Sequence, residues 1–165
     1  MQQSFLGEYP VEVRYNTINT EIFQPTAGDF RKQYGLEDKK IILGVAGVWT
    51  ERKGFGDFLK LRQILDDSVA MVMVGVTQAQ CQSLPAGILG IPRTESPREL
   101  AQIYTAADLL FNPTYEDTYP TVNLEAESCG TRVITYDTGG CAESIKRPDS
   151  RAIPVGGFRQ VPELL

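Results

Sequence analysis

Five nearly continuous apolar runs constrain the fold of this chain more than any other feature of its sequence. They are KIILGVAGV at 40–48, VAMVMVGV at 69–76, GILGI at 87–91, DLLFNP at 108–113 and TRVITY at 131–136. Strands with one wet face alternate apolar and polar residues, whereas these runs do not alternate. They are therefore typical of strands buried on both faces, as in a parallel sheet.

Segments with helical spacing separate these runs. Each places its apolar side chains on one stripe, as expected for a helix with one buried face. In GDFLKLRQILDD at 56–67 the stripe is formed by Phe58, Leu61, Ile64 and Leu65. In SPRELAQIYTAAD at 96–108 it is formed by Leu100, Ile103 and Tyr104. Ser96, with Pro97 next and Glu99 three residues on, predicts an N-cap with a capping box. Strand and helix alternate about every 25 to 30 residues, so the predicted fold is α/β: a doubly wound, Rossmann-like parallel sheet.

One such sheet accounts for the length of the chain. Its 165 residues suit a single core and leave no room for a second domain of similar size. We expect residues 1–25 to form a connector and first strand, because VEVRYNTINTEIFQPT at 11–26 is typical of a strand followed by a linker. Residues 26–165 form the predicted domain. The ending RQVPELL looks interrupted, which suggests a piece of a longer protein.

Charge and composition exclude several classes of function. With 16 Lys and Arg against 21 Asp and Glu, the formal charge of -5 disfavours non-specific binding to nucleic acid or to an anionic membrane. The absence of His removes the commonest general base and metal ligand. Cys81, Cys129 and Cys141 form no CxxC, so neither a disulfide framework nor a zinc site is indicated and a reducing cytoplasm fits best. No run approaches the roughly 18 apolar residues of a membrane span, and the N-terminus lacks signal-peptide character.

Ligands of such folds bind beyond the carboxyl ends of the strands, which here means loops 44–54, 91–97 and 112–121. In GVAGVWTERKGF at 44–55, Gly44 and Gly47 allow close backbone approach, and Arg52 and Lys53 place two cations before the next helix. These features suit a diphosphate, or equally a tight turn with a solvated basic pair. GxGxxG is missing, and no acid for a ribose follows the second strand, so an NAD-type domain is disfavoured.

The segment TYEDTYPTVNLEAESCG at 114–130 predicts a helix that begins at Pro120. The amides of Thr121 and Val122 would then be free to bind an anion. Glu125, about one turn further on, suits the vicinal hydroxyls of a ribose. Asp117 would lie on the open side. The alternative interpretation needs no ligand: an acid near the start of a helix is stabilised by the helix dipole by about 0.3–1 kcal/mol.

Three other features have structural interpretations. YDTGGCAES at 136–144 is expected to form a turn, with Gly139 and Gly140 leading onto a helix. Trp49 is expected to serve packing more than recognition. Met71 and Met73 are expected in the core.

Taken together, these stretches resemble the C-terminal, donor-binding domain of GT-B glycosyltransferases, specifically the retaining group known as family 4. The resemblance runs from VEVRYNTINTEIFQPT through RKG to ELAQIYTAADLLFNPTYEDTYPTVNLEAESCGTRVITYDTGGCAE, nearly the whole chain. It is most similar to bacterial enzymes that build capsular, exopolysaccharide or lipopolysaccharide chains. The resemblance implies transfer of a sugar from a UDP- or GDP-sugar with retention, without a metal or other cofactor.

The resemblance also implies roles for individual residues. The family's Glu-x7-Glu pair falls on Asp117, where Asp replaces Glu, and on Glu125. Glu125 would hold the ribose, and Asp117 would lie beside the donor sugar. Glu116 is a candidate to replace Asp117 in that contact. Lys53 matches the family's phosphate-binding Lys. The position of the family's phosphate-binding Arg, after Gly47, is Val48 here, and Arg52 is a candidate to supply that charge. Backbone around Thr118, Tyr119, Thr121 and Val122 would complete the phosphate site, and loop 91–94, with Arg93, would touch the base.

The implied partners are the sugar nucleotide and an N-terminal acceptor domain of the same parent chain. Membrane contact is expected only through that other half, in a cytoplasmic enzyme that is peripheral at the inner face of the membrane. By itself, this chain is expected to bind nucleotide without appreciable transfer. A non-catalytic nucleotide-binding module is the alternative.

Overall fold

A parallel sheet with the strand order β3-β2-β1-β4-β5-β6 organises the computed structural model, which describes residues 9–165. Its strands are β1 (Lys40–Val45), β2 (Val69–Val74), β3 (Ile88–Ile91), β4 (Leu109–Asn112), β5 (Val133–Tyr136) and β6 (Arg151–Ile153). The α-helices are α1 (Phe30–Gln33), α2 (Phe55–Arg62), α3 (Gln78–Ser83), α4 (Pro97–Ala106) and α5 (Thr121–Ser128). Short 3-10 turns are η1 (Glu51–Lys53), η2 (Ala142–Ser144), η3 (Phe158–Gln160) and η4 (Pro162–Leu164).

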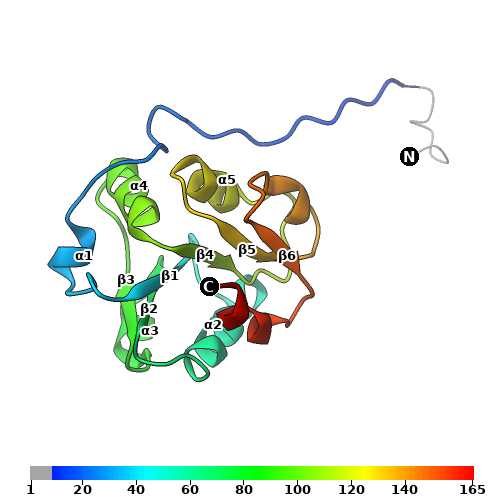
Figure 1. Ribbon diagram of the computed structural model, residues 1–165. Helices are drawn as coiled ribbons and strands as arrows, with labels where there is room; N and C mark the ends of the chain where they lie inside the picture. Colours follow the sequence, from blue (N-terminus) through cyan, green and yellow to red (C-terminus); the bar gives the residue numbers. More distant parts are fainter. Residues whose placement is uncertain (1–8) are drawn as a thin grey trace.

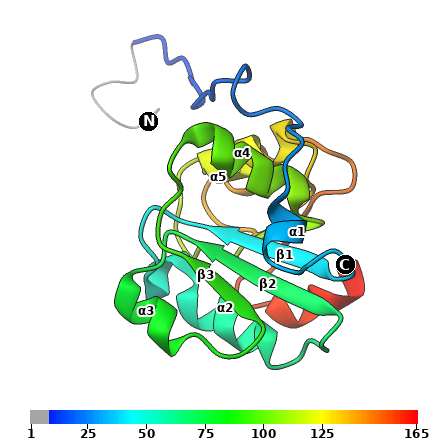
Figure 2. The same cartoon turned by 90° about the vertical axis from the view of Figure 1, so that its left-hand side faces the viewer.

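Helices cover both faces of this sheet, as Figure 2 shows. One core cluster joins the sheet to α2 and to the C-terminal turns through Phe58, Leu61, Phe158 and Val161. The other joins the opposite face to α1, α4 and α5 through residues such as Phe30, Ile103 and Ala126. This arrangement confirms the predicted doubly wound, Rossmann-like α/β fold.

All five strands predicted from apolar runs are present, slightly shorter than the runs themselves. Every residue of β2 is buried, and Met71 and Met73 are fully inaccessible, as expected for core positions. The prediction missed β6, which has three residues of which only Ile153 is buried. So short a strand carries too little apolar pattern to be detected.

The predicted helical details are partly wrong. Helix α2 ends at Arg62, so Ile64 lies beyond it and is exposed. The Ser96 side chain caps α4 by accepting from the Glu99 amide, but the Glu99 carboxylate accepts from the Glu95 amide, so the reciprocal half of the capping box is absent. The helix expected after Gly140 is only the single turn η2.

Residues 9–19 form an extended arm that passes over α5 (Figure 1), and a turn at 20–24 follows it. The strand expected within 11–26 does not form, because the segment passes over α5 and pairs with neither edge strand of the sheet, β3 or β6. The arm instead contacts the domain through side chains: Tyr15 stacks on Tyr119 at 4.6 Å between ring centroids, and Asn16 donates to the Tyr119 carbonyl at 3.2 Å. Residues 1–8 of the expected connector lie outside the described residues.

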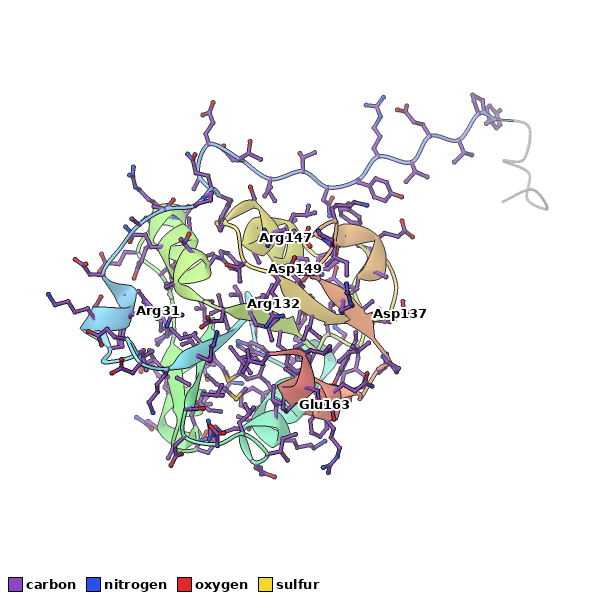
Figure 3. All side chains as sticks on the ribbon, viewed as in Figure 1. Arg31, Arg132, Asp137, Arg147, Asp149 and Glu163 are labelled. Atoms are coloured by element: carbon purple, nitrogen blue, oxygen red, sulfur yellow. The ribbon has the colours of Figure 1, made fainter. Side chains whose placement is uncertain are left out.

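Two arginines labelled in Figure 3 attach peripheral segments to the sheet. Arg31 of α1 contacts Asp108, just before β4, at 2.7 Å and also donates to the backbone carbonyl of Lys39. Arg132, just before β5, donates to the carbonyl of Leu165 at 2.6 Å. These bonds hold the four-residue α1 and the last turns in place, since neither segment is long enough to be stable alone.

Asp57 carries a buried hydrogen-bond network between α2 and the sheet. Its side chain is 4% exposed and accepts from the hydroxyls of Tyr115 and Tyr136 and from Lys60. Burial acts to raise the pKa of this carboxyl, but the hydrogen bonds outweigh burial and bring the pKa below its usual value. The ionised form is therefore the one that stabilises the fold.

We expect Asp57→Asn to lower the free energy of unfolding by about 2 kcal/mol at neutral pH, because a buried donor loses its charged acceptor. Since the folded-state pKa is lowered, the contribution of the carboxylate is present above the usual Asp pKa and is lost as the pH falls through the folded value. Urea unfolding should therefore show the difference from wild type shrinking in acid. Exposed Asp67→Asn is the control; equal losses in both variants would contradict the network's role.

Candidate functional site

Two adjoining cavities lie at the carboxyl ends of the central strands. The first, of about 260 Å³, is lined by Asn16, Val45, Ala46, Gly47, Lys53, Asn112, Asp117, Tyr119, Pro120, Thr121 and Val122. The second, of about 470 Å³, is lined by Val45, Ala46, Gly47, Val74, Gly75, Pro92, Arg93, Thr94, Leu100, Val122 and Glu125. They share the end of β1 and Val122, so together they form one cleft across the loops predicted to bind ligand.

An ion pair between Lys53 and Asp117 lies on the wall of the first cavity. Lys53 Nζ is 2.7 Å from Asp117 Oδ2, and both side chains are largely buried. Lys53 ends the η1 turn, and Gly54 follows it with a φ of 76°. A Cβ at Gly54 would lie 2.1 Å from the Pro113 carbonyl oxygen, so only glycine allows the two loops to approach this closely.

The loop that carries Asp117 is supported by Gly139 and Gly140. The Gly140 amide donates to the Asp117 carbonyl at 3.2 Å, and a Cβ at Gly140 would lie 1.9 Å from the Thr118 carbonyl oxygen. Asp117 Oδ1 also accepts from the Tyr119 amide. The two glycines therefore form the expected turn, and their structural task is to support the loop at 117–119.

Helix α5 begins with its amino end at the first cavity. Thr121 and Val122 line this cavity, and within residues 9–165 no protein acceptor takes their backbone amides. A buried chain of hydrogen bonds fixes the start of the helix: Asn112 donates to Asn123, which donates to Ser144. Lys53 and the two amides thus offer positive charge on one cavity, which suits an anion such as a diphosphate.

Glu125 lies in the second cavity, away from Asp117 in the first. Its Oε2 atom accepts from the hydroxyl of Tyr104 at 2.8 Å. Burial raises the pKa of Glu125, while hydrogen bonds with Tyr104 and Thr121 act to lower it. The two acids therefore face different parts of the cleft.

Three predicted residues line neither cavity. Arg52 and Glu116 are exposed and lie 3.7 Å apart, beside the loop but outside the cleft. Thr118 packs its carbonyl against Gly140 instead. The remaining predicted residues, Gly47, Lys53, Arg93, Asp117, Tyr119, Thr121, Val122 and Glu125, all line the cleft.

Sequence reasoning missed several residues of the site. Asn16 reaches the first cavity from the arm, and Asn112 lines it at the end of β4. An Asn that closes an apolar strand was the available signal for Asn112. Trp49, in the predicted loop, is 3% exposed and donates from Nε1 to the Val74 carbonyl, so it serves packing as expected.

Among the helices of residues 9–165, none combines the length and the apolar character that crossing a membrane requires. Across the same residues, no three His, Cys, Asp or Glu side chains converge as ligands for a metal ion.

The chain is similar to known glycosyltransferases in sequence. It is 26% identical over 137 residues to the alpha-galactosylglucosyldiacylglycerol synthase of Streptococcus pneumoniae, which covers 74% of this chain and 36% of that protein. It is 30% identical over 151 residues to the D-inositol 3-phosphate glycosyltransferase of Stackebrandtia nassauensis, which covers 78% of this chain and 33% of that protein. The chain therefore spans about a third of the length of these curated relatives.

Solved structures share its fold. HepE of Anabaena, crystallised with UDP and glucose, superposes with a TM-score of 0.79 at 16% identity, over 93% of this chain and 45% of that one. The C-terminal domain of LpcC, a glycosyl transferase group 1 family protein from Francisella tularensis, superposes with a TM-score of 0.70 at 18% identity, over 89% of this chain and 85% of that one. The family model described as glycosyl transferases group 1 matches residues 27–153, and the chain belongs to this family.

Proposed function

We propose that this chain is the donor-binding part of a retaining glycosyltransferase and binds a nucleoside diphosphate sugar along the cleft. The observation that carries the proposal is the convergence of Lys53, the free amides of α5 and Glu125 on two adjoining cavities. The first cavity offers positive charge to a diphosphate, and the second offers a carboxylate to a ribose. Loop 92–94, with Arg93, then faces the base.

In this proposal the chain stabilises the leaving group. As the bond from the sugar to the diphosphate breaks, negative charge grows on the phosphate oxygens. Lys53 and the amides of Thr121 and Val122 are already oriented toward that charge, which is the condition for electrostatic stabilisation of a transition state. Asp117, neutralised by Lys53 at 2.7 Å, would lie beside the sugar.

The acceptor belongs to a second part of the proposal. The relatives in S. pneumoniae and Campylobacter jejuni are named as a glycolipid synthase and a diphospho-undecaprenol N-acetylgalactosaminyltransferase. These names support a lipid-linked or surface-polysaccharide acceptor, bound by an N-terminal domain of the parent enzyme. Without that domain, this chain is proposed to bind nucleotide without appreciable transfer.

Isothermal titration calorimetry with UDP, GDP and ADP tests the donor site. We expect one of the three to bind, and Glu125→Ala to weaken that nucleotide about 10- to 150-fold, because a hydrogen bond to a charged group contributes about 1.5–3 kcal/mol. Glu116→Ala, which removes an exposed acid outside the cleft, is the matched control and should bind as wild type does. Binding of none of the three, or indifference to Glu125→Ala, would refute the proposed function.

A further inference from the structure

Tyr104 is a buried residue of α4 whose hydroxyl points to the cleft residue Glu125. Its side chain is fully inaccessible, and its hydroxyl donates to Glu125 Oε2 at 2.8 Å. The backbone carbonyl of Tyr104 accepts from the Thr131 hydroxyl, and Phe23 packs edge-on against the ring at 6.2 Å. Glu125 and Phe23 thus hold the side chain of Tyr104, and Thr131 holds its backbone.

This contact uses one of the roughly four acceptor sites of the Glu125 carboxylate and leaves the others, on both oxygens, for the two hydroxyls of a ligand. Oε2 is held by Tyr104 from the protein side, while the residue itself lines the second cavity. A carboxylate free to rotate has many ways to accept one hydroxyl, but accepting two adjacent hydroxyls requires a fixed plane.

We propose that Tyr104 is a positioning residue that orients Glu125 for simultaneous recognition of the 2′- and 3′-hydroxyls of a ribose, so that the cleft selects ribonucleotides over deoxyribonucleotides. The inference rests on the proposed function and names the residue that sets its sugar selectivity. Tyr104 acts through Glu125 and does not line the cleft itself.

The electrostatics give this role a pH signature. Burial of Tyr104 holds the pKa of its hydroxyl well above the usual value, so the group remains a proton donor over the working range. The other ionisable groups placed around Glu125 are Cys129, one turn further along α5, and Arg93, which lines the same cavity. Burial raises the pKa of Glu125 and the Tyr104 hydrogen bond opposes that rise, so removing the hydroxyl should raise the pKa further.

The experiment compares UDP and GDP with their 2′-deoxy forms, by calorimetry, for wild type and Tyr104→Phe. We expect wild type to prefer the ribonucleotide by about tenfold or more and Tyr104→Phe to lose most of that preference. Binding needs the ionised carboxylate, so affinity for the ribonucleotide is lost as the pH is lowered. In Tyr104→Phe this loss should begin at a higher pH than in wild type.

Tyr136→Phe is the matched control, because Tyr136 is also buried and also donates its hydroxyl to a buried carboxylate, that of Asp57. It should reduce stability without changing the ribose preference or the pH profile. If Tyr104→Phe does not fold, Phe23→Leu provides the second variant, since it loosens the packing on the Tyr104 ring, leaves Glu125 itself unchanged and should reduce the same preference.

The experiment distinguishes failure of the proposed function from failure of the inference about Tyr104. If wild type binds none of the nucleotides, the proposed function is overturned and this inference with it. If wild type binds and Tyr104→Phe keeps both the ribose preference and the pH profile, the inference alone is overturned.

Discussion

Replacing Lys53 with Met is expected to weaken nucleoside diphosphate binding by at least about 30-fold and up to several thousandfold. Lys53 is a cation on the wall of the first cavity; its side chain is 30% exposed, and its ammonium lies 2.7 Å from Asp117. Removing one partner of a desolvated charge pair typically costs about 2–5 kcal/mol. Here the loss is compounded because the carboxylate of Asp117, left without its cation, would face the phosphates.

The neighbouring residue provides the control for this prediction. Arg52→Met removes the same formal charge one position earlier, but Arg52 is 64% exposed, pairs with Glu116 and lines neither cavity. Its removal should change affinity by less than about threefold, within the range of exposed ion pairs. Calorimetry on both variants decides the matter: an equal loss in both would mean that general charge, and not the position of Lys53, attracts the ligand.

The double variant Lys53→Met with Asp117→Asn separates the two parts of the effect. It removes the uncompensated carboxylate together with the cation. Partial recovery of affinity relative to Lys53→Met would measure the repulsion by Asp117, while the remaining deficit would measure the contact of Lys53 with the diphosphate.

Gly140→Ala is expected to cause a large loss of stability through the loop that carries Asp117. A Cβ there would lie 1.9 Å from the Thr118 carbonyl oxygen, so the backbone of one of the two loops must move. That movement would also break the hydrogen bond from Gly140 to the Asp117 carbonyl. Overpacking against backbone is expected to cost about 3 kcal/mol, which lowers the melting temperature by about 6–12 °C in a domain of this size.

Gly47→Ala is the matched control, since a Cβ at Gly47 meets no atom within 4 Å. It should melt within about 2 °C of wild type, even though Gly47 lines both cavities and the new methyl group faces the ligand. Nucleotide affinity should fall in Gly140→Ala because the loop that carries Asp117 and leads into α5 is displaced. If Gly140→Ala melted at the same temperature as wild type, the two loops would be able to separate at little cost in free energy.

Much of the fold could be predicted because its signals are local. The apolar runs that become β1 and β2 are buried on both faces, and burial of that kind leaves a pattern in consecutive residues. Short elements escaped because they have no such pattern: α1 is held by the contacts of Arg31, and β6 by pairing with β5. The expected strand in the arm failed for the opposite reason, since its composition suits a strand but the arm passes over α5 and pairs with no strand of the sheet.

The residues of the candidate site also divide into those that the sequence could predict and those that it could not. Lys53, Asp117 and Glu125 could be selected from the sequence because loops after parallel strands meet at one edge of the sheet. Charge and position in the loop did not separate Lys53 from Arg52, and both were expected at the phosphates. In the η1 turn consecutive side chains point about 120° apart, so one cation enters the cleft and its neighbour faces solvent.

By itself, the sequence determined the α/β fold, the five principal strands, the family resemblance and the loops around the cleft, because hydrophobic period and loop position are properties of neighbouring residues. Only the tertiary structure decided that Lys53 meets Asp117 across 64 positions, that the two acids lie in separate cavities, and that Tyr104 supports Glu125. Those relations depend on how loops and helices pack across the sheet, and contacts between distant segments leave no periodic pattern in a single chain.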